Sequence, residues 1–243
     1  MSNTCKIFIL AGESSGDLHG GYLMKSLKKI NPHIEFSGIG GSLMEAEGLN
    51  SLVPLNKMSV MGFVEVLKHL PFFMGLKKKV LTKISQEKFT QIILIDYPGF
   101  NLNLLPKLKK ITTAKITYYI CPQIWAWKEK RIDLLKKYVD NKIVIFPFEP
   151  EWYKNRGVDV NFFGHPILDE WEPLTKEKLA EILNLNSEKP ILTLYPGSRD
   201  QEFNKHISIL IEAAKIIKNK IPDIQVIIGC AKSIDISKFS NNF

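Results

Sequence analysis

Side chains that could do chemistry follow several apolar segments of this 243-residue chain. The segment AGESSGD at 11–17 comes directly after the first apolar run and opens a predicted helix. Its two glycines let backbone approach a ligand, and a helix N-terminus presents free N–H groups to an anion. It lacks the lysine of a phosphate-binding P-loop and the three glycines of a dinucleotide-binding turn. Ser14, Ser15 and Asp17 could equally cap the helix, so a ligand site and a tight turn both stay open.

A second candidate is Asp96, in the segment IDYPGFN at 95–101. It stands at the carboxyl end of a predicted buried strand, where ligands bind in open α/β sheets. A carboxylate there can take a proton from a hydroxyl nucleophile if burial holds its pKa near the working pH. The alternative is a cap for the helix predicted from Asn101. The position at the strand end favours a functional role.

Aromatic side chains follow a further strand in YYICPQIWAWKEKR at 118–131. Trp125 and Trp127 could stack on a ring or a sugar, and three basic residues lie beyond them. Buried tryptophans more often fill a core, which is the interpretation that these residues favour by themselves.

The segment LYPGSR at 194–199 is another strand followed by a turn. Gly197 and Ser198 offer backbone and hydroxyl donors, and Arg199 offers a planar fork that suits phosphate. The alternative is an ordinary surface arginine. Its place between a strand and a helix favours an anion site.

An unusually apolar amphipathic stretch runs over 60–81. Phe72, Phe73 and Met74 are followed by Lys77, Lys78 and Lys79. An apolar wedge beside lysines is typical of an interfacial membrane anchor. A helix hairpin packed on the sheet is the alternative.

Metal and cofactor sites find no support in the sequence. The histidines show no ligand spacing, and the three cysteines are far apart. His165 follows a strand in FFGHP and could contact a ligand, although a hydrogen-bonded structural histidine is commoner. We expect no metal and no cofactor.

Composition and charge exclude several classes of protein. A hydrophobic content of 45% and a charged content of 24% exclude disorder, collagen and coiled coil. No run reaches the ~18–20 apolar residues of a membrane span, and the N-terminus lacks the features of a signal peptide. We therefore expect a cytosolic-type protein. The net charge of +8 suits an anionic membrane or phosphate-bearing substrates at least as well as nucleic acid, for which no motif is present.

The candidate residues lie between alternating strand and helix patterns. Nearly continuous apolar runs predict strands buried on both faces, as in a parallel sheet: Lys6–Ala11, Ile34–Ile39, Gln91–Ile95, Lys115–Ile120, Asn141–Phe146, Ile191–Tyr195 and Gln225–Gly229. Amphipathic stretches between them predict helices near 17–30, 61–87, 101–110, 128–138, 175–184 and 202–220. The repeated order predicts an α/β fold with doubly wound parallel sheets.

We expect two domains, at 1–170 and 171–243. A polar helix and loop separate the first series of strands from a new strand at Ile191. The second block holds only two strands around one helix, which cannot cover both faces of a sheet. We therefore expect the second Rossmann-like domain to be incomplete.

Taken in order, the motifs resemble one family. AGESSGDLHG, MSVMGFVEVL, IDYPGFN, CPQIWAWKEKR, PFE, FFGHP and LYPGSR make the chain similar to the lipid-A-disaccharide synthases, inverting glycosyltransferases of the GT-B class. The likeness runs from about Lys6 to about Gly229. It implies two Rossmann-like domains and transfer from UDP-2,3-diacylglucosamine to 2,3-diacylglucosamine 1-phosphate, giving a β-1,6 disaccharide and UDP. It also implies a peripheral enzyme on the cytoplasmic face of the inner membrane, without metal.

The resemblance also implies roles for single residues. Asp96 matches the base for the acceptor hydroxyl, with Glu13 in reserve, and Arg199 with Gly197 and Ser198 matches the loop near the donor diphosphate. Substrate contacts are implied for a second set of residues: Ser15, Gly16, Asp17, Asn101 and Trp125. Because both substrates carry acyl chains, the resemblance also implies that the segment from Phe72 to Lys78 contacts acyl chains or the membrane.

The chain departs from the family where the second domain should continue. The resemblance implies that this sequence holds little of the donor half, so we expect weak or no transfer unless another chain, or self-association, supplies the rest. Two alternatives stay open: a UDP-sugar epimerase, which shares the fold, and a non-catalytic module that binds membrane or acylated sugar phosphate.

Overall fold

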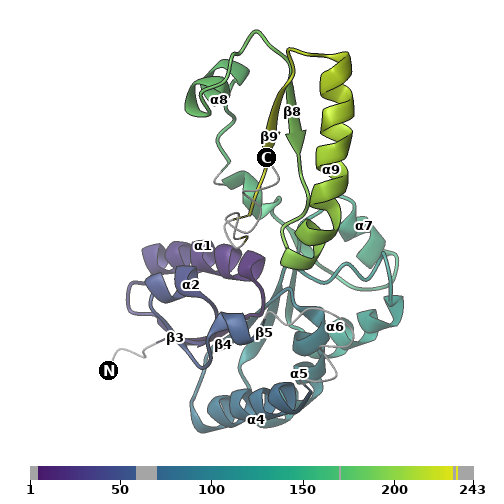
Figure 1. The fold of residues 1–243 in the computed structure, drawn as a ribbon. Helices are drawn as coiled ribbons and strands as arrows, with labels where there is room; N and C mark the ends of the chain where they lie inside the picture. The colour runs from purple at the N-terminus through teal and green to yellow at the C-terminus, as the bar shows by residue number, and fades with distance from the viewer. Residues whose placement is uncertain (1–4, 59–69, 170, 232–233, 235–243) are drawn as a thin grey trace. The chain divides into compact units, whose positions relative to one another are not determined.

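The computed structural model describes residues 5–58, 70–169, 171–231 and 234. The chain divides into two compact units, Met1–Trp171 and Glu172–Phe243. Figure 1 shows both units.

The first unit is built on a seven-stranded sheet in the order β3-β2-β1-β4-β5-β6-β7, and each neighbouring pair is parallel. The strands are β1 (Lys6–Ala11), β2 (Glu35–Ile39), β3 (Leu49–Ser51), β4 (Gln91–Ile95), β5 (Lys115–Tyr119), β6 (Asn141–Val144) and β7 (Asn161–Phe162). The helices are α1 (Ser14–Ile30), α2 (Ser42–Ala46), α4 (Leu70–Gln86), α5 (Pro98–Ile111), α6 (Ile132–Tyr138) and α7 (Glu149–Lys154). Short 3₁₀ turns lie at Leu55–Lys57, Glu129–Arg131 and Pro166–Asp169.

Helices cover both faces of this sheet (Figure 1). Alternate residues of a strand point to opposite faces. Phe8 and Leu10 of β1 therefore belong to the core cluster that α4 and α5 cover, whereas Ile7 and Ile9 belong to the cluster that includes Met24 of α1. Burial on both faces explains why the strands read as continuous apolar runs, and it confirms the predicted doubly wound α/β fold.

The second unit contains α8 (Lys176–Ile182), β8 (Ile191–Leu194), α9 (Asp200–Lys220) and β9 (Gln225–Ile228). The strands β8 and β9 pair in parallel, with α9 as the connection between them. Phe203 and Ile207 of α9 form a small core with Ile234.

Several predicted boundaries move for identifiable reasons. The strand predicted to Phe146 ends at Val144, because the N–H groups of Ile145 and Phe146 donate to the Glu149 carboxylate. Helix α5 begins at Pro98 rather than near Asn101, since proline suits the first turn of a helix. The elements that the sequence does not predict are short: α2, β3, α7 and β7.

Two of the three members of the predicted apolar wedge pack partly inward. Phe72 and Phe73 are half-buried and pack against the core cluster under α4, and the Phe73 ring lies 6.1 Å from that of Phe100. Met74 is 65% exposed. The first part of the predicted helix, at 61–69, and most of the motif MSVMGFVEVL lie outside the described residues.

Candidate functional site

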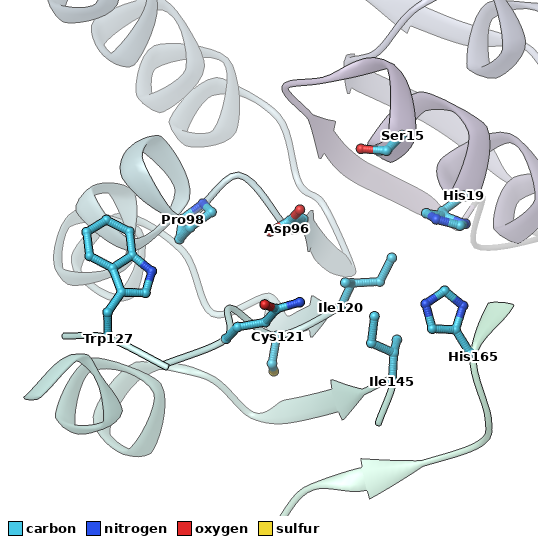
Figure 2. A pocket seen from close by; sticks show the side chains of 11 residues that line it. Ser15, His19, Asp96, Pro98, Ile120, Cys121, Trp127, Ile145 and His165 are labelled. Atoms are coloured by element: carbon cyan, nitrogen blue, oxygen red, sulfur yellow. The ribbon is translucent and has the colours of Figure 1, made fainter. Parts of the chain in front are cut away.

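A pocket of about 330 Å³ opens at the carboxyl ends of the strands of the first unit. The chain runs in one direction across the sheet from β1 to β3 and in the other from β4 to β7, so the strand order reverses between β1 and β4. Ligands of open α/β sheets bind at this point. Figure 2 shows the lining residues: Ser15, Gly16, His19, Asp96, Pro98, Ile120, Cys121, Gln123, Trp127, Ile145 and His165.

Asp96 enters the pocket from an unusual turn. Asp96 and Tyr97 both have left-handed backbone conformations, with φ values of 41° and 48°. Residues other than glycine adopt this region only where their surroundings hold them there. Here the carbonyl of Asp96 accepts hydrogen bonds from the Tyr118 hydroxyl at 2.7 Å and from Asn101 Nδ2 at 2.8 Å. Its N–H donates to the carbonyl of Tyr119 at 3.1 Å, so the backbone of the turn is fixed on both sides.

Asn101 supports this turn and does not line the pocket. The side chain is fully buried, and Nδ2 also donates to the Ile95 carbonyl at 3.3 Å. The substrate contact expected for Asn101 is therefore replaced by a contact with the Asp96 turn.

Tyr97 joins this turn to the loop after β1. Its ring lies over Gly12, where a Cβ atom would come within 2.3 Å of the ring, and its hydroxyl donates to the Met58 carbonyl at 3.0 Å. Burial, together with the nearby Glu13 carboxylate, raises the pKa of Tyr97 to about 12. The hydroxyl therefore remains a donor, and Glu13 belongs to the surroundings of the same turn.

The loop AGESSGD divides into pocket residues and a structural residue. Glu13 is the N-cap residue of α1, and Ser15 and Gly16 line the pocket from the first turn of the helix. Asp17 is 5% exposed and lies outside the lining. Its carboxylate accepts from the N–H groups of Gly41, Leu43 and Met44 at 2.7–3.2 Å. The expectation that Asp17 binds substrate is thus corrected, because its oxygens cap α2.

Two histidines lie in the pocket: His165, for which the sequence leaves a ligand contact open, and His19, which the sequence does not single out. His19 follows Ser15 by one helical turn on α1, and His165 comes from the segment after β7. Their ring centroids are 6.5 Å apart, edge to face. Burial and the neighbouring His165 lower the pKa of His19. The sequence signals for this pair are the i, i+4 spacing of Ser15 and His19 and the place of His165 after a strand.

Of the two tryptophans after β5, Trp127 lines the pocket and Trp125 does not. Trp127 is 59% exposed. Trp125 donates from Nε1 to the Glu149 carboxylate at 3.0 Å, and its ring packs edge-on against Phe148. Trp125 thus has a structural role through its polar atom, which Glu149 uses, and its contact with substrate stays a prediction.

Glu149 is a buried carboxylate that organises one wall of the pocket. It is fully buried and accepts from Trp125, from the Ile145 N–H at 3.0 Å and from the Phe146 N–H at 2.8 Å. Ile145 lines the pocket, and the Phe146 ring lies 6.0 Å from that of His165. In the sequence Glu149 appears only within the motif PFE, and nothing in that motif indicates a buried carboxylate.

Cys121 lines the pocket as a thiol. It is 2% exposed, and burial, with Glu149 nearby, raises its pKa far above the ordinary value. A thiol in this state is a poor nucleophile. Within the described ranges, no three histidine, cysteine, aspartate or glutamate side chains gather so that they could hold a metal ion.

In the second unit, the predicted anion loop lies between β8 and α9. Gly197 has a φ of 125°, and a Cβ atom there would come within 2.5 Å of Glu202. Arg199 is the N-cap residue of α9, and its guanidinium lies 3.3 Å from the Glu202 carboxylate. Ser198 is exposed beside it.

A groove of about 440 Å³ runs between α4 and α5 of the first unit. It is lined by Met74, Lys77, Lys78 and Lys107, among others, so apolar and basic side chains share one surface. Desolvation and the neighbouring Lys107 lower the pKa of Lys77. Over the described part of the chain, no helix combines the length and apolar composition needed to span a bilayer.

Comparison with solved structures shows the fold. UDP-GlcNAc 2-epimerase from Neisseria meningitidis, bound to UDP-GlcNAc, aligns with a TM-score of 0.61 and 10% identity, over 94% of this chain and 66% of that one. HepE of Anabaena in complex with UDP-glucose aligns with a TM-score of 0.54 and 13% identity, over 98% and 64%. At these identities the likeness concerns architecture alone.

Comparison with sequences shows the family. A lipid-A-disaccharide synthase of Coxiella burnetii (strain Dugway 5J108-111) is 38% identical over 242 residues, 98% of this chain and 63% of that protein. Lipid-A-disaccharide synthase 1 of Legionella pneumophila (strain Lens) is 40% identical over 244 residues, covering all of this chain and 64% of that protein. The chain thus spans less than two thirds of the length of these relatives. A family model described as lipid-A-disaccharide synthetase matches residues 7–240, and the chain belongs to this family.

Proposed function

We propose that the chain contributes to a glycosyltransferase reaction of lipid A biosynthesis. The donor is UDP-2,3-diacylglucosamine, the acceptor is 2,3-diacylglucosamine 1-phosphate, and the products are the β-1,6 disaccharide 1-phosphate and UDP. One observation carries the proposal in a chain of this family: Asp96 is presented to a pocket at the switch point of the sheet by a left-handed turn. A carboxylate fixed in this way suits a base whose position must be accurate.

In this mechanism the Asp96 carboxylate accepts the proton of the acceptor 6-hydroxyl. The oxygen forms a bond to the anomeric carbon of the donor, while the bond to the diphosphate breaks and its electron pair leaves with UDP. Attack from the face opposite the leaving group inverts the anomeric centre. Glu13 is the reserve candidate for the base. Its carboxylate is near Tyr97, the residue after Asp96 in the turn, and this proximity supports it as the alternative.

The pocket volume supports a sugar as the ligand. About 330 Å³ is at the small end of the range for small-molecule sites. We propose that one sugar ring occupies the pocket and that the acyl chains lie outside it.

The loop of Gly197, Ser198 and Arg199 is proposed to bind the donor diphosphate. A guanidinium makes paired hydrogen bonds to phosphate, and the N-terminus of the 21-residue α9 follows directly. Gly197 has a positive φ, a backbone conformation that glycine adopts readily, and this supports a glycine at the turn between β8 and α9.

The surface between α4 and α5 is proposed to contact the acyl chains and the anionic membrane, on the cytoplasmic face of the inner membrane. Met74 offers exposed apolar area, and Lys77, Lys78 and Lys107 offer charge. Phe72 and Phe73 support α4 from inside. Polybasic segments gain about 1 kcal/mol for each lysine near an anionic surface.

A transfer assay in detergent micelles tests the proposal. Wild-type chain, Asp96→Asn and the matched control Asp133→Asn, which changes an exposed carboxylate on α6, are given labelled acceptor and UDP-2,3-diacylglucosamine. We expect the control to form as much disaccharide as the wild type, and Asp96→Asn to form at least 100-fold less, the scale of general base catalysis. Equal activity in all three would exclude Asp96 as the base. Conversion of UDP-N-acetylglucosamine without acceptor would instead identify an epimerase.

A further inference from the structure

We propose that Ser15, His19 and His165 form a binding corner for a phosphate monoester carried by the acceptor sugar. This inference rests on the proposed function only in taking a sugar phosphate as the ligand. Because all three side chains carry hydrogen-bond donors, they are named the donor corner.

The fold brings the donor corner together from two distant segments. Ser15 and His19 are four residues apart on α1, so they share one face of the helix. His165 faces them from the segment after β7, with its ring 6.5 Å from that of His19. Figure 2 shows His19 and His165 on one side of the pocket and Trp127 on the opposite side, with Asp96 between them.

Hydrogen bonding fixes which ring atoms can donate. His165 Nδ1 accepts from the Ile167 N–H at 3.2 Å, so its proton resides on Nε2. The Nδ1 atom of His19 is buried and has no hydrogen-bond partner among the described residues. Because a buried N–H without a partner is rare, we assign the proton of His19 to Nε2 as well. The corner thus presents two imidazole N–H donors and one hydroxyl.

An anion is the ligand that fits these donors. Donors that converge without a carboxylate among them suit phosphate oxygens. Burial, and then the neighbouring His165, lower the pKa of His19, so its ring is neutral at neutral pH and donates from Nε2. Two buried carboxylates are near these segments in sequence, and both are occupied: Asp17 accepts from three backbone N–H groups, and Glu149 accepts from the Trp125 ring N–H and two backbone N–H groups.

The donor corner also orients the ligand. The Asp96 carboxylate repels a phosphate and accepts from a hydroxyl. A sugar phosphate therefore binds with its phosphate at the histidines and a hydroxyl at Asp96. This is the orientation that proton removal from that hydroxyl requires.

Nuclear magnetic resonance of the imidazole Cε1–H signals tests the corner in the 243-residue chain at neutral pH. The probes are glucosamine 1-phosphate, inorganic phosphate and glucosamine. We expect the signals of His19 and His165 to shift with the sugar phosphate and much less with glucosamine, while the signal of the exposed His33 stays in place. Equal shifts with glucosamine and glucosamine 1-phosphate, or no shift at millimolar concentrations, would overturn the proposal. A response to inorganic phosphate alone would restrict the site to free phosphate and also overturn it.

Variants separate the donors from the ring packing. His165→Phe keeps a ring beside Phe146 but removes the donor, and we expect binding of glucosamine 1-phosphate about tenfold weaker, the size of one hydrogen bond to a charged group. His165→Gln places an amide N–H near the position of Nε2 and should restore binding. Equal binding by both variants would refute the donor role. Neither measurement needs a UDP-sugar, so equal transfer by wild type and Asp96→Asn, together with positive binding, would refute the proposed base and leave the corner standing.

Discussion

The Tyr118 hydroxyl donates a 2.7 Å hydrogen bond to the backbone carbonyl of Asp96, and this bond links strand β5 to the left-handed turn that follows β4. Tyr118 is fully buried, and burial raises its pKa well above the ordinary value, with the Asp96 carboxylate adding to the effect. The hydroxyl therefore stays a donor at any working pH. The backbone of the proposed base is held by a neighbouring strand as well as by its own loop.

Tyr118→Phe removes this bond and keeps the ring. We expect a loss of about 1 kcal/mol in the free energy of unfolding, the usual worth of one such bond. We also expect kcat to fall about tenfold with little change in KM, because a displaced carboxylate affects proton transfer more than ground-state binding. Steady-state kinetics and urea unfolding measure both quantities. Tyr22→Phe on α1 is the matched control, and a kcat equal to wild type in Tyr118→Phe would show that the turn does not need the bond.

Gly12→Ala tests the contact between the loop after β1 and Tyr97. The new methyl group would lie within 2.3 Å of the Tyr97 ring, so the ring must move and its bond to the Met58 carbonyl must weaken. We expect the free energy of unfolding to fall by about 1–3 kcal/mol, as for other overpacked sites. Urea unfolding measures this change. In a Tyr97→Leu background the same substitution should lower the free energy of unfolding much less. Equal decreases in both backgrounds would contradict the contact.

Gly99→Ala is the matched control for that measurement. Gly99 lies in α5, and a Cβ atom there would meet nothing within 4 Å. Alanine is a better helix former than glycine, so this variant should be as stable as the wild type or more stable, by up to about 1 kcal/mol.

Glu149→Gln tests the buried carboxylate behind the pocket wall. Glutamine presents one acceptor oxygen and one NH₂ group to the three N–H donors that Glu149 now accepts, so at least one donor loses its partner. We expect a loss of about 2–4 kcal/mol in the free energy of unfolding and a change in the emission of Trp125. Glu151→Gln, an exposed residue of the same helix, should change neither. An unaltered unfolding curve for Glu149→Gln would mean that the carboxylate is dispensable.

The strands of the first unit could be predicted because burial on both faces leaves a continuous apolar signal, as in Lys6–Ala11 and Gln91–Ile95, whose predicted bounds are confirmed. The two-residue strand β7 and the three-residue strand β3 are too short to leave such a signal. The end of β6 could not be predicted, because it depends on a side chain three to four residues downstream that takes over the N–H groups of the chain.

The candidate site was harder to predict than the fold. Asp17 and Asp96 are both acidic residues just beyond a strand, and only the fold shows that the first caps α2 while the second lines the pocket. The partners of Asp17 are 24–27 residues away along the chain, beyond the reach of local patterns. The contact between His19 and His165 joins segments that no spacing rule connects.

Acid should destabilise the first unit through His19. Burial, then the neighbouring His165, lowers the pKa of His19 below its ordinary value of 6.5, so the unfolded chain binds this proton more readily than the folded one. The contribution of His19 to stability is therefore fully present above pH 6.5 and is lost as the pH falls through the lowered value. Urea unfolding of wild type, His19→Gln and the control His33→Gln from pH 8 to pH 5 measures the difference. We expect the stability of His19→Gln to fall less steeply below pH 6.5 than that of the other two proteins. If the stability of all three proteins changed with pH in the same way, His19 would have the same pKa in the folded and the unfolded chain. That result would contradict the repulsion between the two histidines.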